Sequence, residues 1–305
     1  MNREAMRSTG WLCVSFVFCV FMPAIVAAQA PTFESVGVRA RGMAGAFVAV
    51  ADDATATWWN PAGLASDAFF DATLEFGRAA DPTRTRAGGF ATKVLGLGLS
   101  YYRLQLREIR AVGPVGPAPV NREDRSVVNL FGVTTGQSLG EHFAVASTLK
   151  IVHAGETHGD YDVGVMAAAG GARVGLTVRH LTAPTFGSGA DEFELTRQVR
   201  TGLALTGRGR GSIDELTLAF DADVTTTPTP FGDARHIAGG VEAWVRGRRV
   251  GVRGGVSVST VGEANPAPSG GLSVALGRGM YLDGAVTGGS DQARRGWAIG
   301  LRATY

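Results

Sequence analysis

Cysteine is nearly absent from this sequence. The chain holds two, Cys13 and Cys19, and both fall within its first 28 residues. If that segment is removed, the remaining protein has no thiol, which excludes disulfides, thiol catalysis and cysteine-ligated metals. A strong net charge is also absent. The formal value is +2, so the composition predicts no general attraction to nucleic acid.

Long apolar runs are missing after residue 30. None reaches the roughly 18 residues that a spanning helix needs, although 45% of the residues are hydrophobic. Insertion of this part of the chain into a membrane would therefore require β-strands. Proline is scarce at 12 residues and glycine is abundant at 44, a balance that suits a curved, closed sheet better than a low-complexity segment.

The first 28 residues have the features of a secretory signal peptide. Arg3 and Arg7 precede an apolar core from Trp11 to Val26, and Val26 and Ala28 have the spacing that signal peptidase prefers. We expect cleavage after Ala28. The alternative is an uncleaved anchor, which is disfavoured because the apolar core is shorter than a spanning helix.

From about residue 69 to the end, apolar and polar residues alternate in short segments separated by turn residues. In 215–224, for example, Leu216, Leu218 and Phe220 fall on one face and acidic residues on the other. The pattern predicts fourteen strands, at 69–78, 86–94, 96–106, 125–135, 142–153, 161–169, 172–181, 194–206, 214–224, 234–246, 248–260, 268–277, 279–288 and 294–305. Two of these, 96–106 and 125–135, alternate poorly, so twelve strands is the alternative.

The connections between these strands alternate between short turns and longer loops. The long ones fall at 107–124, 154–160, 182–193, 225–233 and 261–267. An even strand count with this parity is typical of bacterial outer-membrane barrels, whereas a soluble β-sandwich is the competing interpretation. We expect an all-β, transmembrane antiparallel β-barrel over 69–305, preceded by a signal peptide at 1–28 and a separate segment at 29–68.

The last strand favours the barrel. Trp297, Ile299, Leu301 and Tyr305 share one face, and an aromatic terminal residue preceded by alternating apolar residues is what such barrels present to the barrel-assembly machinery.

Residues 29–68 do not alternate. Asp52 or Asp53 is placed to cap a short helix that runs through Trp59, and Pro61 would end that helix. Exposed tryptophans would be unfavourable in a free extension, so we expect a hatch inside the barrel. Its motif residues are Gly42, Gly45, Asp52, Asp53, Trp58, Trp59, Asn60, Pro61, Ala62 and Gly63.

The stretch GVRARGMAGAFVAVADDATATWWNPAGLA, residues 37–65, resembles the N-terminal hatch signature of the FadL-like outer-membrane proteins. This group includes FadL/TodX-type transporters of hydrophobic compounds and PorV/PorQ relatives. Residues 175–205 are similar to the middle region of PorV-type proteins. The resemblance implies a fourteen-strand barrel. Because the chain looks shorter than the transporters, the resemblance also gives weight to the compact PorV-like members, which act as shuttles or assembly partners.

The alternation places charges of both signs on the inner face of the barrel. We expect them to pair with one another, with water or with the hatch, because unpaired buried charge is costly. A polar path is the other interpretation. These lumen charges include Asp71, Glu75, Lys150, Arg173, Arg179, Arg200, Asp221, Asp223, Glu242, Arg253 and Arg302.

No catalytic set emerges from the sequence. The five histidines are scattered, and His153, His158 and Asp160 are the only group whose spacing suggests a metal, with no fourth ligand evident. Phosphate-binding and nucleophile-elbow motifs are missing. We therefore predict a protein without enzyme activity, metal or cofactor.

The leading hypothesis is a porin-like, FadL-like barrel of the Gram-negative outer membrane. It would pass a hydrophobic or amphipathic small molecule when the hatch moves. The alternative is an interaction protein whose loops and rim dock exported substrates or secretion-system components. Outer-membrane lipid and the barrel-assembly machinery are the expected partners in both cases, and nucleic acid in neither.

Overall fold

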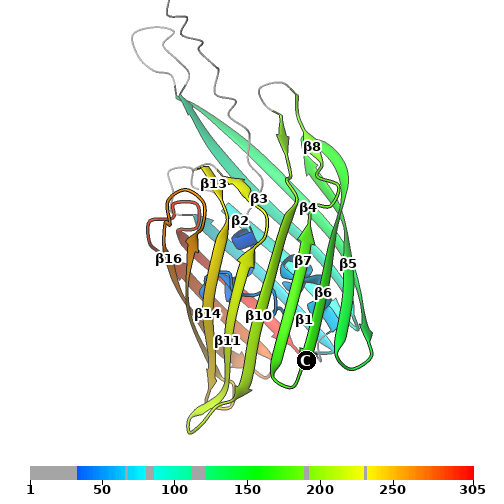
Figure 1. Ribbon diagram of the computed structural model, residues 1–305, viewed down its shortest axis with the longest axis vertical. Helices are drawn as coiled ribbons and strands as arrows, with labels where there is room; N and C mark the ends of the chain where they lie inside the picture. The colour runs from blue at the N-terminus through cyan, green and yellow to red at the C-terminus, as the bar shows by residue number, and fades with distance from the viewer. Residues whose placement is uncertain (1–32, 66–67, 80–85, 112–120, 189–191, 230–231) are drawn as a thin grey trace, which may run out of the picture.

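The computed structural model describes residues 33–65, 68–79, 86–111, 121–188, 192–229 and 232–305, and the predicted signal peptide lies outside them. Fourteen strands close into one antiparallel barrel (Figure 1), which confirms the predicted fold class and count. The barrel strands are β1 (Phe70–Ala79), β2 (Arg86–Val94), β3 (Leu97–Ala111), β4 (Asn121–Leu139), β5 (Phe143–Ala154), β6 (Glu156–Ala169), β7 (Ala172–Arg179), β10 (Gln198–Arg208), β11 (Ile213–Asp223), β14 (His236–Val245), β15 (Val250–Ser259), β16 (Ala267–Gly277), β17 (Met280–Thr287) and β18 (Gly296–Thr304).

Each barrel strand pairs with its neighbours along the chain, and β18 pairs with β1 to close the sheet. Two small hairpins lie in the connections at one end, which we call the loop end. One is formed by β8 (Thr185–Phe186) and β9 (Phe193–Glu194), the other by β12 (Thr227–Thr229) and β13 (Gly232–Ala234). Tight turns and the chain's C-terminus lie at the opposite end, the turn end (Figure 1). Within the described residues, no helix is both long and apolar enough to cross a membrane.

Two of the predicted loops are wrong. Residues 107–111 and 121–124 of the predicted loop 107–124 are strand, because β3 and β4 stay in register as far as the pair Ala111 and Asn121. The predicted loop 154–160 is a tight turn at Gly155, whose φ of +84° suits glycine. The ladder continues past the point where side chains stop alternating because its hydrogen bonds join backbone groups.

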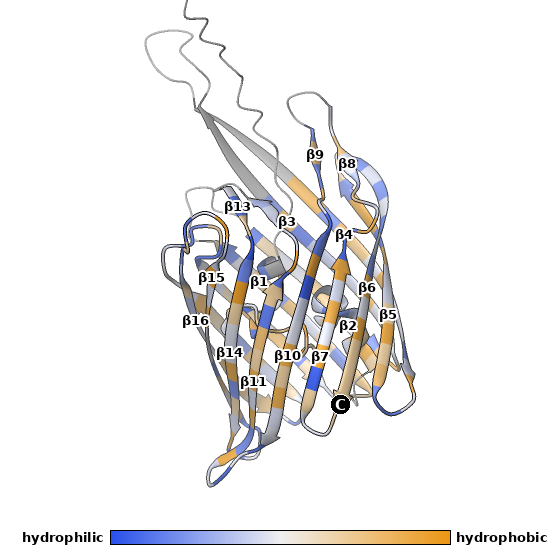
Figure 2. Ribbon diagram, viewed as in Figure 1, coloured by the Kyte–Doolittle hydropathy of each residue, from blue (hydrophilic) through white to orange (hydrophobic). Residues whose placement is uncertain are grey.

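The outer wall is apolar. Phe131 and Leu218 face outward with 52% and 51% of their surfaces exposed, and large hydrophobic residues occupy outward positions on all the barrel strands. Figure 2 shows the alternation along individual strands. A soluble sandwich would bury such residues, whereas a lipid-facing barrel exposes them.

The lumen holds residues 33–65, which we call the luminal segment (Figure 1). It contains η1 (Phe33–Ser35), α1 (Val38–Gly42), α2 (Ala56–Trp59) and η2 (Pro61–Ala65). Helix α1 lies against β15–β18, and η2 lies against β4–β6. Nearly every residue of the segment is buried, so it forms the hydrophobic core of the molecule together with the inner wall.

Candidate functional site in the barrel lumen

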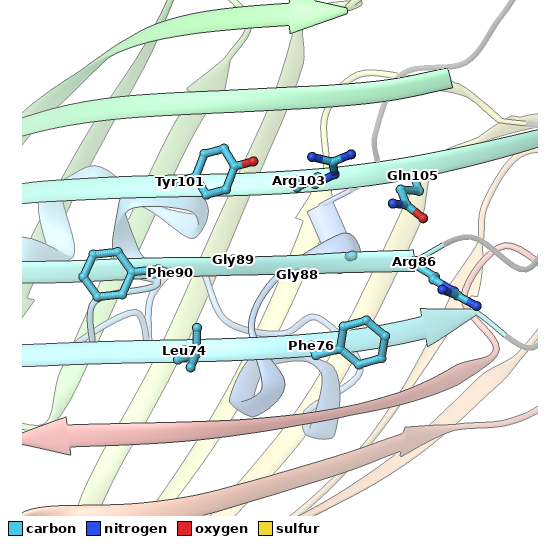
Figure 3. Close-up of a pocket in the computed structure, with 10 residues that line it drawn as sticks. Leu74, Phe76, Arg86, Gly88, Gly89, Phe90, Tyr101, Arg103 and Gln105 are labelled. Atoms are coloured by element: carbon cyan, nitrogen blue, oxygen red, sulfur yellow. The ribbon is translucent and has the colours of Figure 1, made fainter. Parts of the chain in front are cut away.

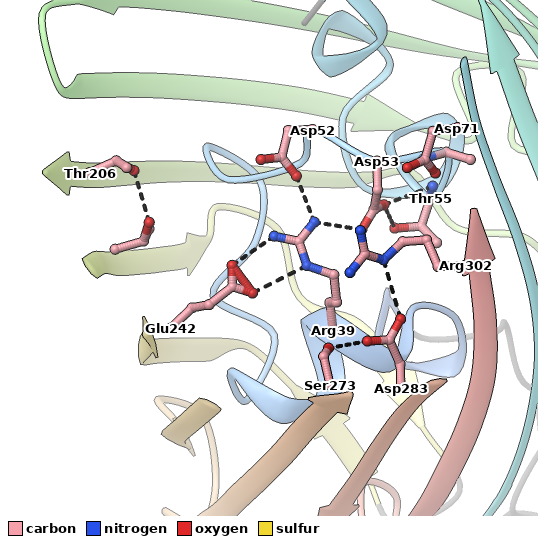
Figure 4. A network of polar contacts seen from close by, with 12 residues as sticks. Arg39, Asp52, Asp53, Thr55, Asp71, Thr206, Glu242, Ser273, Asp283 and Arg302 are labelled. Atoms are coloured by element: carbon pink, nitrogen blue, oxygen red, sulfur yellow. Dashed lines mark hydrogen bonds and ion pairs between the residues drawn. The ribbon is translucent and has the colours of Figure 1, made fainter. Parts of the chain in front are cut away.

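Arg39 of α1 lies at the centre of the largest ionic contact between the luminal segment and the wall (Figure 4). Its Nη1 donates to Asp52 Oδ1 at 2.6 Å and to Asp53 Oδ2 at 2.8 Å, and its Nη2 donates to Glu242 Oε1 of β14 at 2.8 Å. Burial alone would lower the pKa of Arg39, but the three carboxylates outweigh burial and raise it well above its usual value. The contact therefore holds a fixed positive charge between segment and wall.

The same network continues around the wall. Arg253 Nε of β15 donates to Glu242 Oε2 at 2.6 Å, so this carboxylate joins two arginines. On β17, Asp283 accepts from Arg302 Nε at 3.2 Å and also from the hydroxyl of Ser273 (Figure 4). We call Arg39, Asp53, Glu242, Arg253, Asp283 and Arg302 the charged wall network.

Carboxylates of the wall also accept from main-chain amides of the luminal segment. Glu75 of β1 accepts from the amides of Gly37 and Val38 at 2.8 and 3.2 Å, where α1 begins. Asp221 of β11 accepts from the amides of Phe47 and Val48 at 2.9 and 2.8 Å, and Asp71 of β1 accepts from the Ala54 amide at 2.7 Å. These bonds satisfy buried donors of a segment that has little regular structure.

Glu34 forms a second ionic contact on another side of the lumen. Its Oε1 accepts from Arg200 Nη1 of β10 at 2.8 Å and lies 2.6 Å from Arg294 Nη2. Arg200 also pairs with Asp223. Burial would raise the pKa of Glu34, but the two arginines lower it to about 2. Sequence reasoning missed both Glu34 and Arg294. The motif quoted for the hatch begins after Glu34, and the predicted last strand begins at Arg294, whereas this residue lies in the connection before β18.

The predicted turn of the hatch motif is built around Asn60. Its Nδ2 donates to the carbonyls of Val48 and Val165 at 3.0 and 3.3 Å, and its Oδ1 accepts from the Ala62 amide at 3.1 Å. A Cβ at Gly63 would overlap the carbonyl oxygen of Ala51. The Asn60 side chain thus joins Val48 of the luminal segment, the turn at Ala62 and strand β6 of the wall. Gly63 allows the segment to pass close to Ala51.

One of the two aspartates predicted to cap this helix, Asp53, caps the turn with which it begins. Helix α2 itself has Thr55 at its N-cap with no side-chain hydrogen bond. In the turn just before it, Asp53 Oδ1 accepts from the Thr55 amide at 2.9 Å and the Asp53 carbonyl accepts from the Ala56 amide at 3.0 Å, while Asp53 Oδ2 is held by Arg39. The helix does end before Pro61, as expected, and η2 begins there.

The two tryptophans have different surroundings. Trp58 meets the wall through Tyr102 of β3, with ring centroids 5.2 Å apart, and through Arg179 of β7, whose guanidinium carbon lies 3.6 Å from the ring centroid. Trp59 packs mainly within the segment, edge to face with Phe47, and its Nε1 donates to the Val36 carbonyl.

An apolar inner wall lies beside Trp58. Tyr102 of β3 pairs with Leu130 of β4, which pairs with Val152 of β5, and Leu104 pairs with Val128 in the next row. All are buried and belong to one hydrophobic cluster with Trp58. The β8–β9 hairpin supplies Phe186 and Phe193, whose rings stack with centroids 5.2 Å apart. We call these residues and Leu195 the apolar lumen cluster.

His153, His158 and Asp160, the group whose spacing suggested a metal, do not come together. His153 is exposed and His158 is half-buried, while Asp160 is buried beside Asp162 and His180. Lys150 Nζ lies 2.8 Å from Asp160 and 2.6 Å from Asp162, so an ammonium already neutralises these carboxylates. Burial first and Lys150 second lower the pKa of His180 to about 4.

The other residues singled out from the sequence are Arg173, the glycines of the hatch motif and the outward residues of the last strand. Arg173 is half-buried on the same face of β7 as Arg179. Gly42 and Gly45 let the segment approach Gly271 and Glu34, since a Cβ at either position would crowd them. In β18, Trp297, Ile299 and Leu301 face outward, and Tyr305 follows the strand.

Comparison with solved structures places this arrangement among known barrels. The CymD monoaromatic hydrocarbon channel superposes with a TM-score of 0.64 at 12% identity, covering 90% of this chain and 99% of that chain. The Ralstonia pickettii toluene transporter TbuX gives 0.58 at 11% identity, with the same coverage. The chain has the FadL-type fold. A Pseudomonas aeruginosa FadL homologue agrees, with a TM-score of 0.55 at 10% identity, covering 91% of this chain and 99% of the other.

At the level of fold, the resemblance noted at residues 37–65 is therefore confirmed. No protein-family model matches the chain, and no curated protein matches its sequence. The likeness to PorV/PorQ relatives stays a prediction.

Proposed function

We propose that this chain is an outer-membrane barrel that passes hydrophobic or amphipathic small molecules, with the luminal segment as its gate. The apolar outer wall supports the location. Two solved structures with the same fold are a monoaromatic hydrocarbon channel and a toluene transporter, and their substrates support the proposed substrate class. The proposal requires no catalytic step and no cofactor.

The apolar lumen cluster is the observation that carries this proposal. Inner faces of transmembrane barrels are generally polar, yet on β3, β4 and β5 the inward rows are Tyr102, Leu130 and Val152 followed by Leu104 and Val128. Such a wall provides a hydrophobic molecule with apolar contacts from the β8–β9 hairpin down to Trp58. A channel for ions or sugars would not need an apolar inner wall.

The gate is the luminal segment. It fills the lumen between the apolar lumen cluster and the charged wall network, so passage requires it to move. Helix α1 contacts β15–β18, and Arg39 joins it to Glu242. We propose that this ionic side stays fixed while η2 and Trp58 shift away from the apolar wall.

Removal of residues 33–65 tests the proposal. Vesicles that carry the deletion variant should take up both toluene and the polar sugar sucrose faster than vesicles with the intact chain, which should favour toluene. Leu130→Gln should lower toluene uptake several-fold. Phe131→Leu, at the adjacent outward position, should leave uptake unchanged.

The docking alternative makes the opposite prediction. Unchanged uptake in the deletion variant, combined with loss of a co-purifying protein, would contradict transport and support a protein that binds secretion-system components. Heat-modifiable migration of each variant on gels shows that the barrel has folded.

A further inference from the structure

A hollow of about 340 Å³ lies on the outside of the barrel, across β1, β2 and β3 near the loop end (Figure 3). It forms because Gly88 faces outward between Phe76 of β1 and Arg103 of β3, its direct partners in the two ladders. The missing side chain leaves a depression between two large neighbours. The volume is within the range of small-ligand sites, about 300–1,000 Å³.

The hollow changes in character along the strands. Toward the turn end its walls are aliphatic and aromatic, and toward the loop end they are cationic (Figure 3). Across β1, β2 and β3 in turn, the three outward rows are Leu74, Phe90 and Tyr101, then Phe76, Gly88 and Arg103, then Arg78, Arg86 and Gln105. Tyr101 is held in place because its hydroxyl donates to Asn129 Oδ1 at 3.0 Å.

The cationic end of the hollow brings like charges together. Arg78 and Arg86 are directly opposite in the ladder, and like charges in that position repel. None of the side chains that the structure describes gives Arg78, Arg86 or Arg103 a carboxylate partner. Arginine binds phosphate oxygens with two parallel hydrogen bonds, so a phosphate group would relieve the repulsion.

We propose that this hollow, the outer-wall groove, binds one lipid that carries an anionic phosphate group. An acyl chain would lie over Gly88 against Leu74 and Phe90, and the phosphate would meet Arg86 and Arg103. A free phosphate ion would leave the apolar part without a function, and a zwitterionic lipid would not neutralise the arginines. The inference rests on the proposed membrane location, but not on transport.

Native mass spectrometry of the detergent-purified protein tests this proposal. The probes are phosphatidylglycerol and phosphatidylcholine with identical acyl chains. We expect one saturable phosphatidylglycerol adduct, preferred at least 5-fold over phosphatidylcholine. The double variant Arg86→Gln/Arg103→Gln should lose that preference. Gly88→Leu should weaken both adducts, since it fills the hollow while its Cβ makes only ordinary contacts of 3.5 Å or more.

Gly239→Leu is the matched control. Gly239 faces outward on β14, and a Cβ there meets nothing within 4 Å. This variant should bind both lipids as the unsubstituted chain does. Equal binding of the two lipids, equal loss in Gly239→Leu and Gly88→Leu, or full displacement by inorganic phosphate would each overturn the proposal. Heat-modifiable migration reports the barrel and toluene uptake reports transport, so failure of either is distinguished from failure of lipid binding.

Discussion

Arg39 joins the luminal segment to the wall through two hydrogen bonds to the carboxylate of Glu242, at 3.2 and 2.8 Å. Its guanidinium and Glu242 are 6% and 2% exposed, so water gives them little alternative solvation. Removing one partner of a buried pair leaves the other charge uncompensated, which typically costs about 3–5 kcal/mol. The surface pair Arg248 and Glu215, 48% and 35% exposed, should contribute about 1 kcal/mol or less.

Arg39→Gln should therefore lower the free energy of unfolding by about 3–5 kcal/mol, measured by urea titration of tryptophan fluorescence. Arg248→Gln provides the control with an exposed pair. Equal effects of the two substitutions would mean that the charged wall network does not hold the segment.

Glu34 gives a pH dependence whose sign follows from its lowered pKa. The folded value is about 2 and the ordinary value is 4.5, so the stabilisation is complete above pH 4.5 and disappears as the pH falls toward 2. Its size is roughly 3 kcal/mol. The stability difference between the intact chain and Glu34→Gln should shrink across this window in acid titrations. A difference that does not change with pH would show that Arg200 and Arg294 do not act on Glu34 in this way.

At the scale of elements, the alternation of residues and the turn signals between strands predicted fourteen barrel strands, and for the strands that alternate clearly also the direction in which their side chains point. It could not predict the partners of those side chains. Arg39 and Glu242 are 203 residues apart, and a local pattern contains no information about which distant strand approaches the segment. The same limit explains why Asp160 was grouped with His153 and His158 instead of with His180.

The two strands that alternated poorly, 96–106 and 125–135, contained a signal that only the structure explains. Both of their faces carry large apolar residues, because the outer face holds Leu97, Leu99 and Phe131 and the inner face holds Tyr102, Leu104, Val128 and Leu130. Weak alternation in an otherwise alternating barrel indicated the apolar lumen cluster. From the sequence alone, the same weak alternation is equally compatible with a barrel of twelve strands.

The β8–β9 hairpin depends on Phe186, which is fully buried against Phe193. Phe186→Ala should cost about 3–5 kcal/mol locally. The hairpin should then open more often, and the Leu195 amide, bonded to the Pro184 carbonyl at 3.0 Å, should exchange its hydrogen at least about 100-fold faster. Phe220→Ala, on the outward face of β11, creates no internal cavity and should leave that exchange unchanged. If both variants exchange alike, the hairpin is not held by this stack.

At the scale of the whole molecule, the proposed gate can be locked. Val38 of α1 lies against Gly300 of β18, and a Cβ built on Gly300 lies 3.2 Å from Val38 Cγ2. The described part of the chain has no cysteine, so Val38→Cys/Gly300→Cys would introduce the only thiols in that part. A sulfur in the γ position of residue 38 would be within disulfide reach of a cysteine at 300.

That disulfide tests which side of the segment moves. It ties down α1, which we propose is fixed, so toluene uptake should be the same under oxidising and reducing conditions. Loss of uptake on oxidation, with recovery on reduction, would show that the whole segment has to leave the lumen. Gly300→Cys alone reports any effect of the substitution itself.

The division of the lumen into a charged wall and an apolar wall also has a consequence for how such a protein diversifies. Substitutions on β3, β4 and β5 would change the surface that we propose a passing molecule touches. They would leave intact the ion pair that anchors α1 to β14 and the ion pairs between β14 and β15 and between β17 and β18. Under the proposed function, residues that set ligand preference and residues that keep the lumen closed therefore lie on different strands. Mutations can alter the first group while the second group is conserved.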